Sequence, residues 1–151
     1  MSAAHIHLLL NHIPILGSIF GLLLLGYGML RKSDEIQKTS LGVFVITALL
    51  TIPVYLTGDG AAEIVGNLPG VSTAIIQQHN KAATITLIAI EILGVVSLLG
   101  LFLSWCSRRE LRNWMTLGLL ILAMISSGLG AWTGSIGGQI RHTEVRAGFA
   151  K

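Results

Sequence analysis

The chain has 151 residues, of which 52% are hydrophobic and only 11% are charged. Soluble domains carry about 25% charged residues, so this composition cannot cover a water-exposed surface and indicates an integral membrane protein. The net charge of +3, spread beside apolar segments, argues against nucleic-acid binding, and the single cysteine, Cys106, excludes an intrachain disulfide.

Four apolar segments each approach the roughly 20 residues that a helix needs to cross the hydrocarbon layer. They cover about residues 7–30, 40–57, 82–105 and 114–136. The first is longer than the apolar core of a signal peptide, so we expect it to be retained. The pattern predicts an all-α protein, a four-helix transmembrane bundle in one domain.

The segment between the second and third spans predicts local structure near one membrane surface. Residues 57–60 and 69–70 have the composition of turns, and about 61–66 fit a short interfacial helix. Ser72 is suited to cap a helix that continues unbroken into the third span. His79 would then lie about two turns inside that helix.

Basic residues predict the orientation of the bundle. The connections after the first and third spans are short and basic, and the positive-inside rule assigns such connections to the cytoplasm. They carry Arg31, Lys32, Lys38, Arg108, Arg109 and Arg112. Both termini are then expected outside the cytoplasm. Trp105 and Trp114 would mark the cytoplasmic interface, and Tyr55 and Trp132 the opposite one.

The five histidines all fall at the end of the bundle that carries the termini. Imidazole is the usual protein ligand for haem iron and for Zn or Cu. The first and third spans are diagonal in an up-down bundle, so we expect His12 and His79 to face each other as axial ligands of a b-type haem. His7 and His142 would complete a second haem site or support the first, and Arg141, Lys81 and Arg146 are available for propionates.

His5 and His12 are seven residues apart and share one helix face. His5 is closest to the terminus, and we interpret it as a peripheral, interfacial side chain. Pro14 follows His12 closely, and a proline in the first turns is tolerated and can tilt His12 relative to the rest of the span.

Glycines recur at helical spacing on two spans. Gly130, Gly134 and Gly138 are four residues apart, and Gly17 and Gly21 repeat the spacing on the first span. Such stripes mark close contacts between membrane helices. An alternative interpretation is that Gly134 and Gly138 clear space for a porphyrin. The two interpretations are compatible at different depths.

Two alternatives to haem remain open. His12, His79 and His142, with Asp59, Glu63 or Glu144, would suit Zn or Cu, although no compact metal motif is present. The chain could instead be a structural or assembly subunit of a respiratory complex with no cofactor, in which the histidines carry protons or form interface hydrogen bonds.

Glu91 lies near the middle of the third span, where a charge is costly, so its side chain should face the bundle interior. It would serve as a proton relay or quinone-site carboxyl, or as a neutral group bonded between helices. The hydroxyl groups that could pair with it are those of Thr47, Thr51, Ser97 and Ser126.

Four motifs together resemble a family of small four-helix bacterial membrane proteins that is catalogued as a domain of unknown function. They are His-Ile-His-Leu-Leu-Leu-Asn-His-Ile-Pro at 5–14, Thr-Gly-Asp-Gly-Ala-Ala-Glu at 57–63, Leu-Pro-Gly-Val-Ser at 68–72 followed by His79, and Gly-Gly-Gln-Ile-Arg-His-Thr-Glu at 137–144. The family pattern has a carboxylate at Asn80 and often Glu-Pro near Asp59. The resemblance matches His7, His12, His79, His142 and Glu144.

Some relatives in that family resemble companions of Rieske or cytochrome c proteins, which implies electron transport in a bacterial inner membrane. We therefore expect a haem b-binding subunit, with one or two haems, that passes electrons near the periplasmic face. It would be a redox carrier rather than a complete enzyme. A cytochrome c or Rieske protein is the expected partner besides the lipid bilayer, and self-association into a homo-oligomer is left open.

Overall fold

The structure, a computed structural model, describes residues 2–107 and 113–146. Across these ranges it is helical and contains no strand. Four helical segments are long and apolar enough to cross a membrane, namely Ala3–Leu30, Asp34–Gly66, Thr73–Cys106 and Asn113–Arg141. The predicted all-α fold with four membrane-spanning segments is confirmed, and the chain is a multi-pass membrane protein. Arg108, Arg109 and Arg112 of the predicted cytoplasmic connection lie outside the described residues.

The helices that build these segments are α1 (Ala3–Leu10), α2 (Ile13–Leu30), α3 (Asp34–Leu56), α4 (Gly58–Gly66), α5 (Thr73–Ser107) and α6 (Asn113–Arg141), followed by a short 3-10 helix η1 (Thr143–Val145). Local sequence accounts for their starts. Ser33, for example, precedes α3 and its hydroxyl accepts a hydrogen bond from the Ile36 amide at 3.4 Å. Asp34 and Glu35 in the first turn suit the positive end of the helix dipole.

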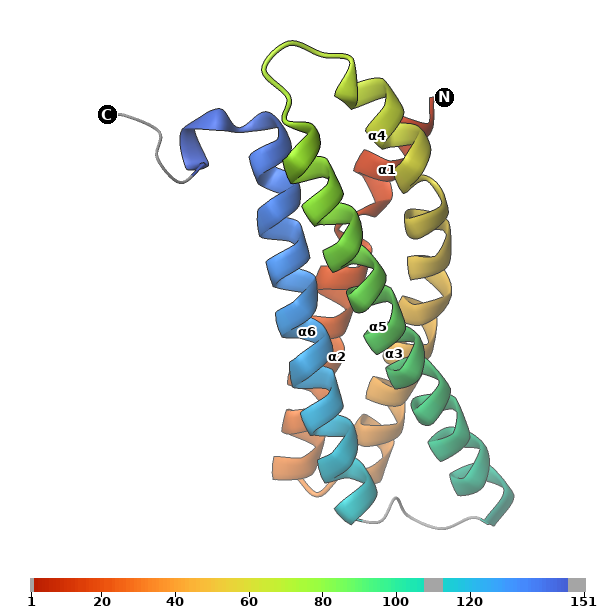
Figure 1. The fold of residues 1–151 in the computed structure, drawn as a ribbon. Coiled ribbons are helices and arrows are strands. Elements are labelled where there is room, and N and C mark those ends of the chain that lie inside the picture. Colours follow the sequence, from red (N-terminus) through yellow and green to blue (C-terminus); the bar gives the residue numbers. More distant parts are fainter. Residues whose placement is uncertain (1, 108–112, 147–151) are drawn as a thin grey trace.

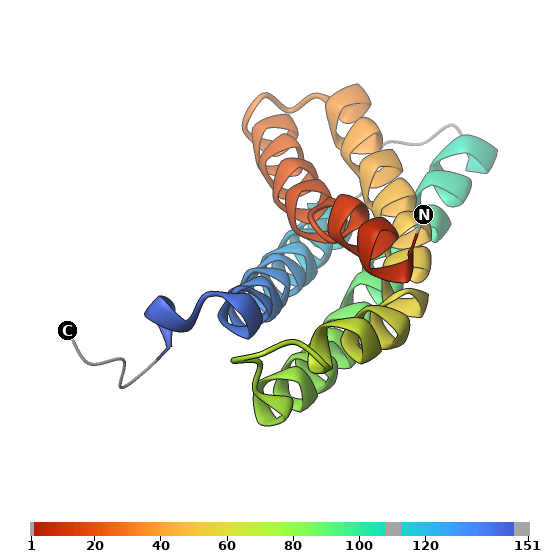
Figure 2. The same cartoon turned by 90° about the horizontal axis from the view of Figure 1, so that it is seen from above.

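The four long helices pack as a ring in which α2 contacts α3, α3 contacts α5, α5 contacts α6, and α6 closes back on α2 (Figures 1 and 2). α2 and α5, the first and third spans, are therefore diagonal. Both described chain ends lie at the same end of the bundle, together with α1 and α4 (Figure 1). All five histidines belong to elements at this end, which we call the histidine end.

The first span is two helices rather than one. α1 ends at Leu10, Asn11 and His12 form a turn, and α2 begins at Ile13 with Pro14 in its first turn. Proline has no amide hydrogen, and its ring collides with the carbonyl of the residue four positions earlier, here Leu10. The break therefore follows from Pro14, and α1 leaves the axis of α2 to pack on α4.

The connection between α3 and α5 is more helical than the sequence predicts. The expected turn at residues 57–60 is wrong, because α4 begins at Gly58 and continues to Gly66. The helical glycines let α1 approach closely: a side chain on Gly60 would begin 2.8 Å from the Ala3 Cβ. The turn at residues 69–70 is confirmed, and Gly70 has the positive φ of 78° that glycine tolerates. α5 begins directly after Ser72 and passes unbroken through His79.

Small residues bring the helices together, as expected where lipid gives no hydrophobic drive. A Cβ on Gly17 would overlap Thr47, and one on Gly21 would overlap the ring of Phe44. Side chains of α3 therefore occupy the space beside both glycines of α2. The hydrophobic core consists of Leu25, Leu41, Phe44, Leu93, Leu119 and Ala123. It lies toward the end opposite the histidines, and buried Ile76, Ala82 and Ile136 continue the apolar interior toward the histidine end.

Large apolar side chains are exposed along the spans, as lipid-facing groups should be. Phe20, Leu49, Ile88 and Met124 are each at least half exposed, one on each long helix. Trp105 and Trp114 are exposed at the end opposite the histidines, at 81% and 67%. Tryptophan at the end of a span is typical of a membrane interface.

Candidate functional site

His7 projects from α1 toward the junction of α3 and α4. Its Nδ1 lies 3.0 Å from the Val54 carbonyl oxygen and 3.4 Å from the Thr57 hydroxyl. A carbonyl oxygen can only accept a hydrogen bond, so Nδ1 carries the hydrogen and Nε2 of the neutral ring keeps its lone pair. Gly58 lies beside the ring, and a Cβ there would begin 3.7 Å from it, at ordinary van der Waals contact. The half-buried His7 is therefore held in one tautomer.

His79 is held in the same way by the opposite wall of the bundle. Its Nδ1 lies 3.1 Å from the Thr133 carbonyl oxygen on α6, so this ring also donates from Nδ1. The Thr133 hydroxyl is itself bonded to the hydroxyl of Thr86 on α5 at 2.7 Å. The ring lies so close to α6 that a Cβ on Gly137 would begin 3.0 Å from its Cε1. Gly137 is thus the position that admits the ring.

His7 and His79 are both half-buried side chains at the histidine end of the bundle. Each ring is fixed through Nδ1 to a main-chain carbonyl of a neighbouring helix, and neither Nε2 forms a hydrogen bond with the described residues. The pair comes from α1 and α5 at the histidine end. Each ring keeps a free Nε2 lone pair, as a metal-ligating histidine with its other nitrogen bonded to a carbonyl does.

His12 does not join this pair, contrary to the expected opposition of His12 and His79. It occupies the turn between α1 and α2, its side chain is exposed, and it borders a groove between α2 and α3 on the outside of the bundle. The helix break at Pro14 sets this position. His5 is exposed as well, and its Nδ1 is 2.9 Å from the Ser2 hydroxyl, as suits a peripheral side chain.

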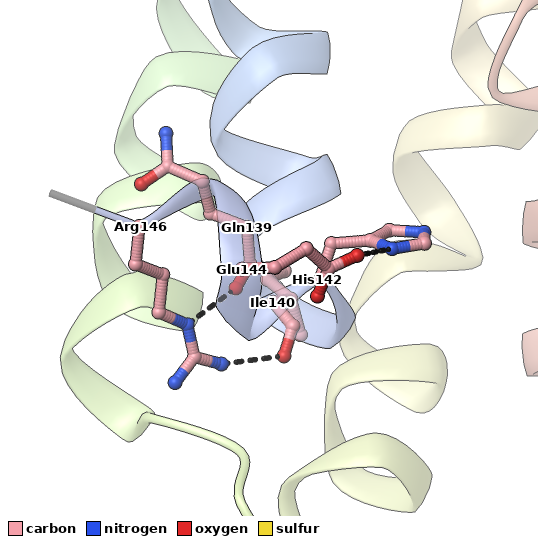
Figure 3. Close-up of polar contacts among 5 residues, drawn as sticks. All are labelled: Gln139, Ile140, His142, Glu144 and Arg146. Atoms are coloured by element: carbon pink, nitrogen blue, oxygen red, sulfur yellow. Dashed lines mark hydrogen bonds and ion pairs between the residues drawn. The ribbon is translucent and has the colours of Figure 1, made fainter. Parts of the chain in front are cut away.

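His142 lies outside the bundle, because α6 ends at Arg141 and the chain turns away into η1. Its ring is exposed and bonded to the Glu144 carboxylate at 2.7 Å (Figure 3). The pKa of Glu144 is lowered, first by a hydrogen bond from its own main chain and then by the one from His142. Arg141 is exposed at the same end, where it is accessible to an anionic group.

The Arg146 guanidinium is hydrogen-bonded to carbonyls at the end of α6, so it is less available to bind an anionic ligand. Its guanidinium donates to the carbonyls of Gln139 at 2.8 Å and Ile140 at 3.0 Å (Figure 3). A further bond of 3.2 Å reaches the Gly70 carbonyl before α5. These carbonyls lack partners within the helix, so Arg146 acts as a cap that ties the C-terminal segment to the α4–α5 connection.

The glycine stripe on α6 packs on α2 over part of its length. Cβ atoms on Gly130 and Gly134 would begin 3.7 and 2.8 Å from Ile15, so the space at both is filled by that side chain. Gly138 has no atom within 4 Å of a built Cβ and faces open space. The interpretation of the stripe as helix contact is confirmed for Gly130 and Gly134. Gly137, which carries the contact with His79, lies one position off the stripe.

Glu91 is half-buried on α5, and its Oε1 is buried without a hydrogen-bond partner in the described structure. The hydroxyls expected to pair with it are used elsewhere or unpaired. Thr47 and Thr51 bond to carbonyls of α3, Ser126 bonds to the Ala89 carbonyl at 3.3 Å, and the buried Ser97 hydroxyl has no partner among the described residues. Glu91 is about 18 Å along the helix from His79.

Within residues 2–107 and 113–146, no three His, Cys, Asp or Glu side chains gather as a bare metal ion requires. The predicted trio of His12, His79 and His142 is distributed over an outer groove, the interior and the exposed C-terminal segment. Sequence reasoning missed Val54, Thr133 and Gly137. The first two act through main-chain carbonyls, which no side-chain pattern reports.

No protein-family model, curated protein or solved structure matched the chain.

Proposed function

We propose that the chain binds haem b through His7 and His79 and carries electrons at the histidine end of the bundle. The observation behind this proposal is that both imidazoles donate Nδ1–H to main-chain carbonyls, of Val54 and Thr133, and keep their Nε2 lone pairs free. A hydrogen bond on the other ring nitrogen is the usual way to fix the tautomer and orientation of a ligating histidine.

The number of ligands favours haem over a bare metal ion. Porphyrin supplies four ligands to its iron, so two histidines complete the coordination of a b-type haem. Zn in proteins is usually held by three or four protein ligands, and the described residues gather no such set. When bound, the haem would supply reversible one-electron chemistry.

The residues around the pair orient the rings rather than react. Gly137 allows the His79 ring to lie close to the backbone of α6, which restricts the rotation of that ring. The carbonyls of Val54 and Thr133 belong to α3 and α6, so the pair also ties α1 and α5 to those helices. Arg141, exposed at the same end, is available for a propionate.

The basic residues at the opposite end support a cytoplasmic assignment for that end, in a bacterial inner membrane. The histidine end would then face the periplasm. A soluble or membrane-anchored redox protein, such as a cytochrome c or a Rieske protein, would exchange electrons with the haem there.

The test is the absorption spectrum of the protein purified from haem-replete cells, with haem measured as pyridine haemochrome. Wild type should show a Soret band, and His7→Ala and His79→Ala should each remove or shift it. His5→Ala and His142→Ala, which change exposed histidines at the same end, are matched controls and should leave the spectrum unchanged.

The variant His12→Ala distinguishes the proposed ligand pair, His7 and His79, from the pair expected from the sequence, His12 and His79. It should leave the Soret band unchanged if His7 and His79 hold the haem. A wild-type protein without haem would refute the proposal, and stoichiometric Cu or Zn in that preparation would favour a bare metal site instead.

A further inference from the structure

Glu91 is an acidic residue in the middle of the third span, and the four spans offer it no counter-charge. No Lys, Arg or His occurs in residues 13–30, 39–58, 82–107 or 113–140. The Glu91 carboxyl forms no hydrogen bond or ion pair with the described residues, and its Oε1 is buried. An unpaired charge at that depth in a membrane is costly, so the carboxyl is neutral and holds a proton.

Glu91 lies on the face of α5 that meets α3. It follows Thr84 by seven residues, so the two side chains fall within about 20° of each other around the helix. Two contacts with α3 bracket Glu91. The Thr84 hydroxyl lies 3.0 Å from the Tyr55 hydroxyl, and a Cβ on Gly94 would overlap the Cβ of Ala48. The half-buried Glu91 side chain therefore lies at the α3–α5 interface.

Hydrogen bonds between hydroxyl groups link this interface to the histidine end. The Thr84 hydroxyl donates to the Asn80 carbonyl at 3.0 Å. A hydroxyl has one hydrogen, so the contact between Thr84 and Tyr55 is donated by Tyr55. Tyr55 is exposed one residue before the end of α3, and its oxygen keeps lone pairs that can accept a further hydrogen bond.

The interval between Glu91 and this pair of hydroxyls can be bridged by water. Glu91 is about 10 Å from Thr84 along the axis of α5. Side chains of a helix lean toward its N-terminus, which for α5 is the histidine end, so the glutamate side chain covers part of that interval (Figure 1). Water commonly joins polar groups that lie too far apart for a direct hydrogen bond.

We propose that Glu91 is a proton-binding site at the α3–α5 interface, which exchanges its proton with water at the histidine end through Tyr55 and Thr84. The Glu91 carboxyl gives its proton to a bridging water. The Tyr55 hydroxyl accepts a proton from that water and releases its own to Thr84, which passes its own to water at the histidine end. The reverse sequence returns a proton to Glu91, and no electron moves.

Few other titratable groups adjoin this route. α3 contributes only Tyr55 in residues 39–58, and α6 contributes none in residues 113–140. The remaining groups on the helices that pack against α5, or on α5 itself, lie at the histidine end, namely Asp59, Glu63, His79 and Lys81. A change in the protonation of the buried carboxyl is therefore attributable to Glu91.

This site goes beyond the proposed haem function and does not depend on it. Glu91 is about 18 Å along α5 from His79, and neither Tyr55 nor Thr84 contacts the carbonyls that hold the two candidate haem ligands. The protonation of Glu91 can be measured without haem in the protein, so failure of one proposal leaves the other standing.

The first test is labelling of the full-length protein in lipid vesicles with dicyclohexylcarbodiimide, a membrane-soluble reagent that adds to carboxyl groups holding a proton. Mass spectrometry should find one label on wild type, at Glu91, and the labelling rate should fall as pH rises. Glu91→Gln should lose the label. Glu63→Gln, which changes an exposed carboxyl on α4, is the matched control and should be labelled as wild type.

The second test follows the route of exchange. The infrared band of the protonated carboxyl, identified by its absence in Glu91→Gln, should shift when the vesicles are transferred to heavy water. Tyr55→Phe should slow that shift severalfold, because it removes the hydroxyl that relays the proton. Tyr27→Phe makes the same change at the opposite end of the bundle and should exchange as wild type.

Three outcomes would overturn the proposal. Wild type that takes up no label at Glu91 would show that the carboxyl holds no proton. Exchange in Tyr55→Phe as fast as in wild type would exclude the route. Protection of Glu91 from the reagent by sodium chloride, but not by choline chloride, would show that the site holds a metal cation instead of a proton.

Discussion

Replacing Gly137 with alanine should disturb the candidate haem ligand His79 directly. The new Cβ would lie 3.0 Å from Cε1 and 3.2 Å from Nδ1 of that ring, while ordinary van der Waals contact begins at 3.4 Å. The ring must therefore retreat by at least 0.4 Å (3.4 minus 3.0). The hydrogen bond from Nδ1 to the Thr133 carbonyl is already 3.1 Å long, so such a shift brings it to the edge of bonding distance.

The expected magnitude follows from two opposed effects. Overpacking of a well-packed site costs about 1–3 kcal/mol. Replacing a helical glycine by alanine returns about 0.5–1 kcal/mol. Gly138→Ala is the matched control, since the same change one residue further meets no atom within 4 Å. Gly138→Ala should gain only the stabilisation that alanine gives a helix, without the cost of overpacking. The free energies of unfolding of the two variants should therefore differ by about 1–3 kcal/mol.

The assay is reversible unfolding of both variants in mixed micelles, followed by circular dichroism, together with the Soret absorbance of each. Gly137→Ala should be the less stable protein and should lose or shift its Soret band, whereas Gly138→Ala should retain it. Equal stability and equal spectra for the two variants would refute the contact between α6 and His79 on which the site is built.

Three further predictions follow from individual contacts. Gly21→Ala should destabilise the bundle by about 1–3 kcal/mol because its Cβ would overlap a buried phenylalanine ring. Gly26→Ala meets open space, and equal melting temperatures for these two variants would contradict that packing. Glu91→Leu should melt at a higher temperature than Glu91→Gln, because only leucine removes the buried, unpartnered polar atom. No difference would mean that the carboxyl is paired or solvated. The pKa of Glu144 is lowered in the folded protein, so the stabilisation linked to it is present above the unfolded pKa and is lost as pH falls through the folded one. His142→Ala should raise that pKa in an NMR titration, and an unchanged value would exclude the hydrogen bond between the two side chains.

The bundle could be predicted from the sequence because its causes are local. Length and hydropathy identify the four spans, and the spacing of Gly17 and Gly21 identifies a packed face. α2 and α3 pack together across a short connection, but α3 and α5 pack together across a connection that contains α4. The ends of the spans were predicted less well, because polar residues extend the helices beyond the hydrocarbon. α3 starts at Asp34 and α5 at Thr73, each several residues before the apolar segment begins.

The histidine site could be predicted only in part. Hydropathy places the five histidines at one end, but the residues that select among them are main-chain carbonyls and a glycine. The Val54 and Thr133 carbonyls would be present whatever the side chains at those positions. Gly137 stands next to the stripe glycine Gly138, and only the rotation of α6 shows which of the two meets a ring.

The spacing of the N-terminal histidines nevertheless helps to distinguish His7 from His5 and His12. At about 100° per residue, His5 and His12 differ by only about 20° around a helix, whereas His7 and His12 differ by about 140°. His5 and His12 are both exposed in the structure, although α1 ends at Leu10 and His12 lies in the turn that follows it. His7 alone remains to reach the interior from the first segment. Pro14 then ends α1 and allows it to lean on α4, which brings the His7 ring to the Val54 carbonyl.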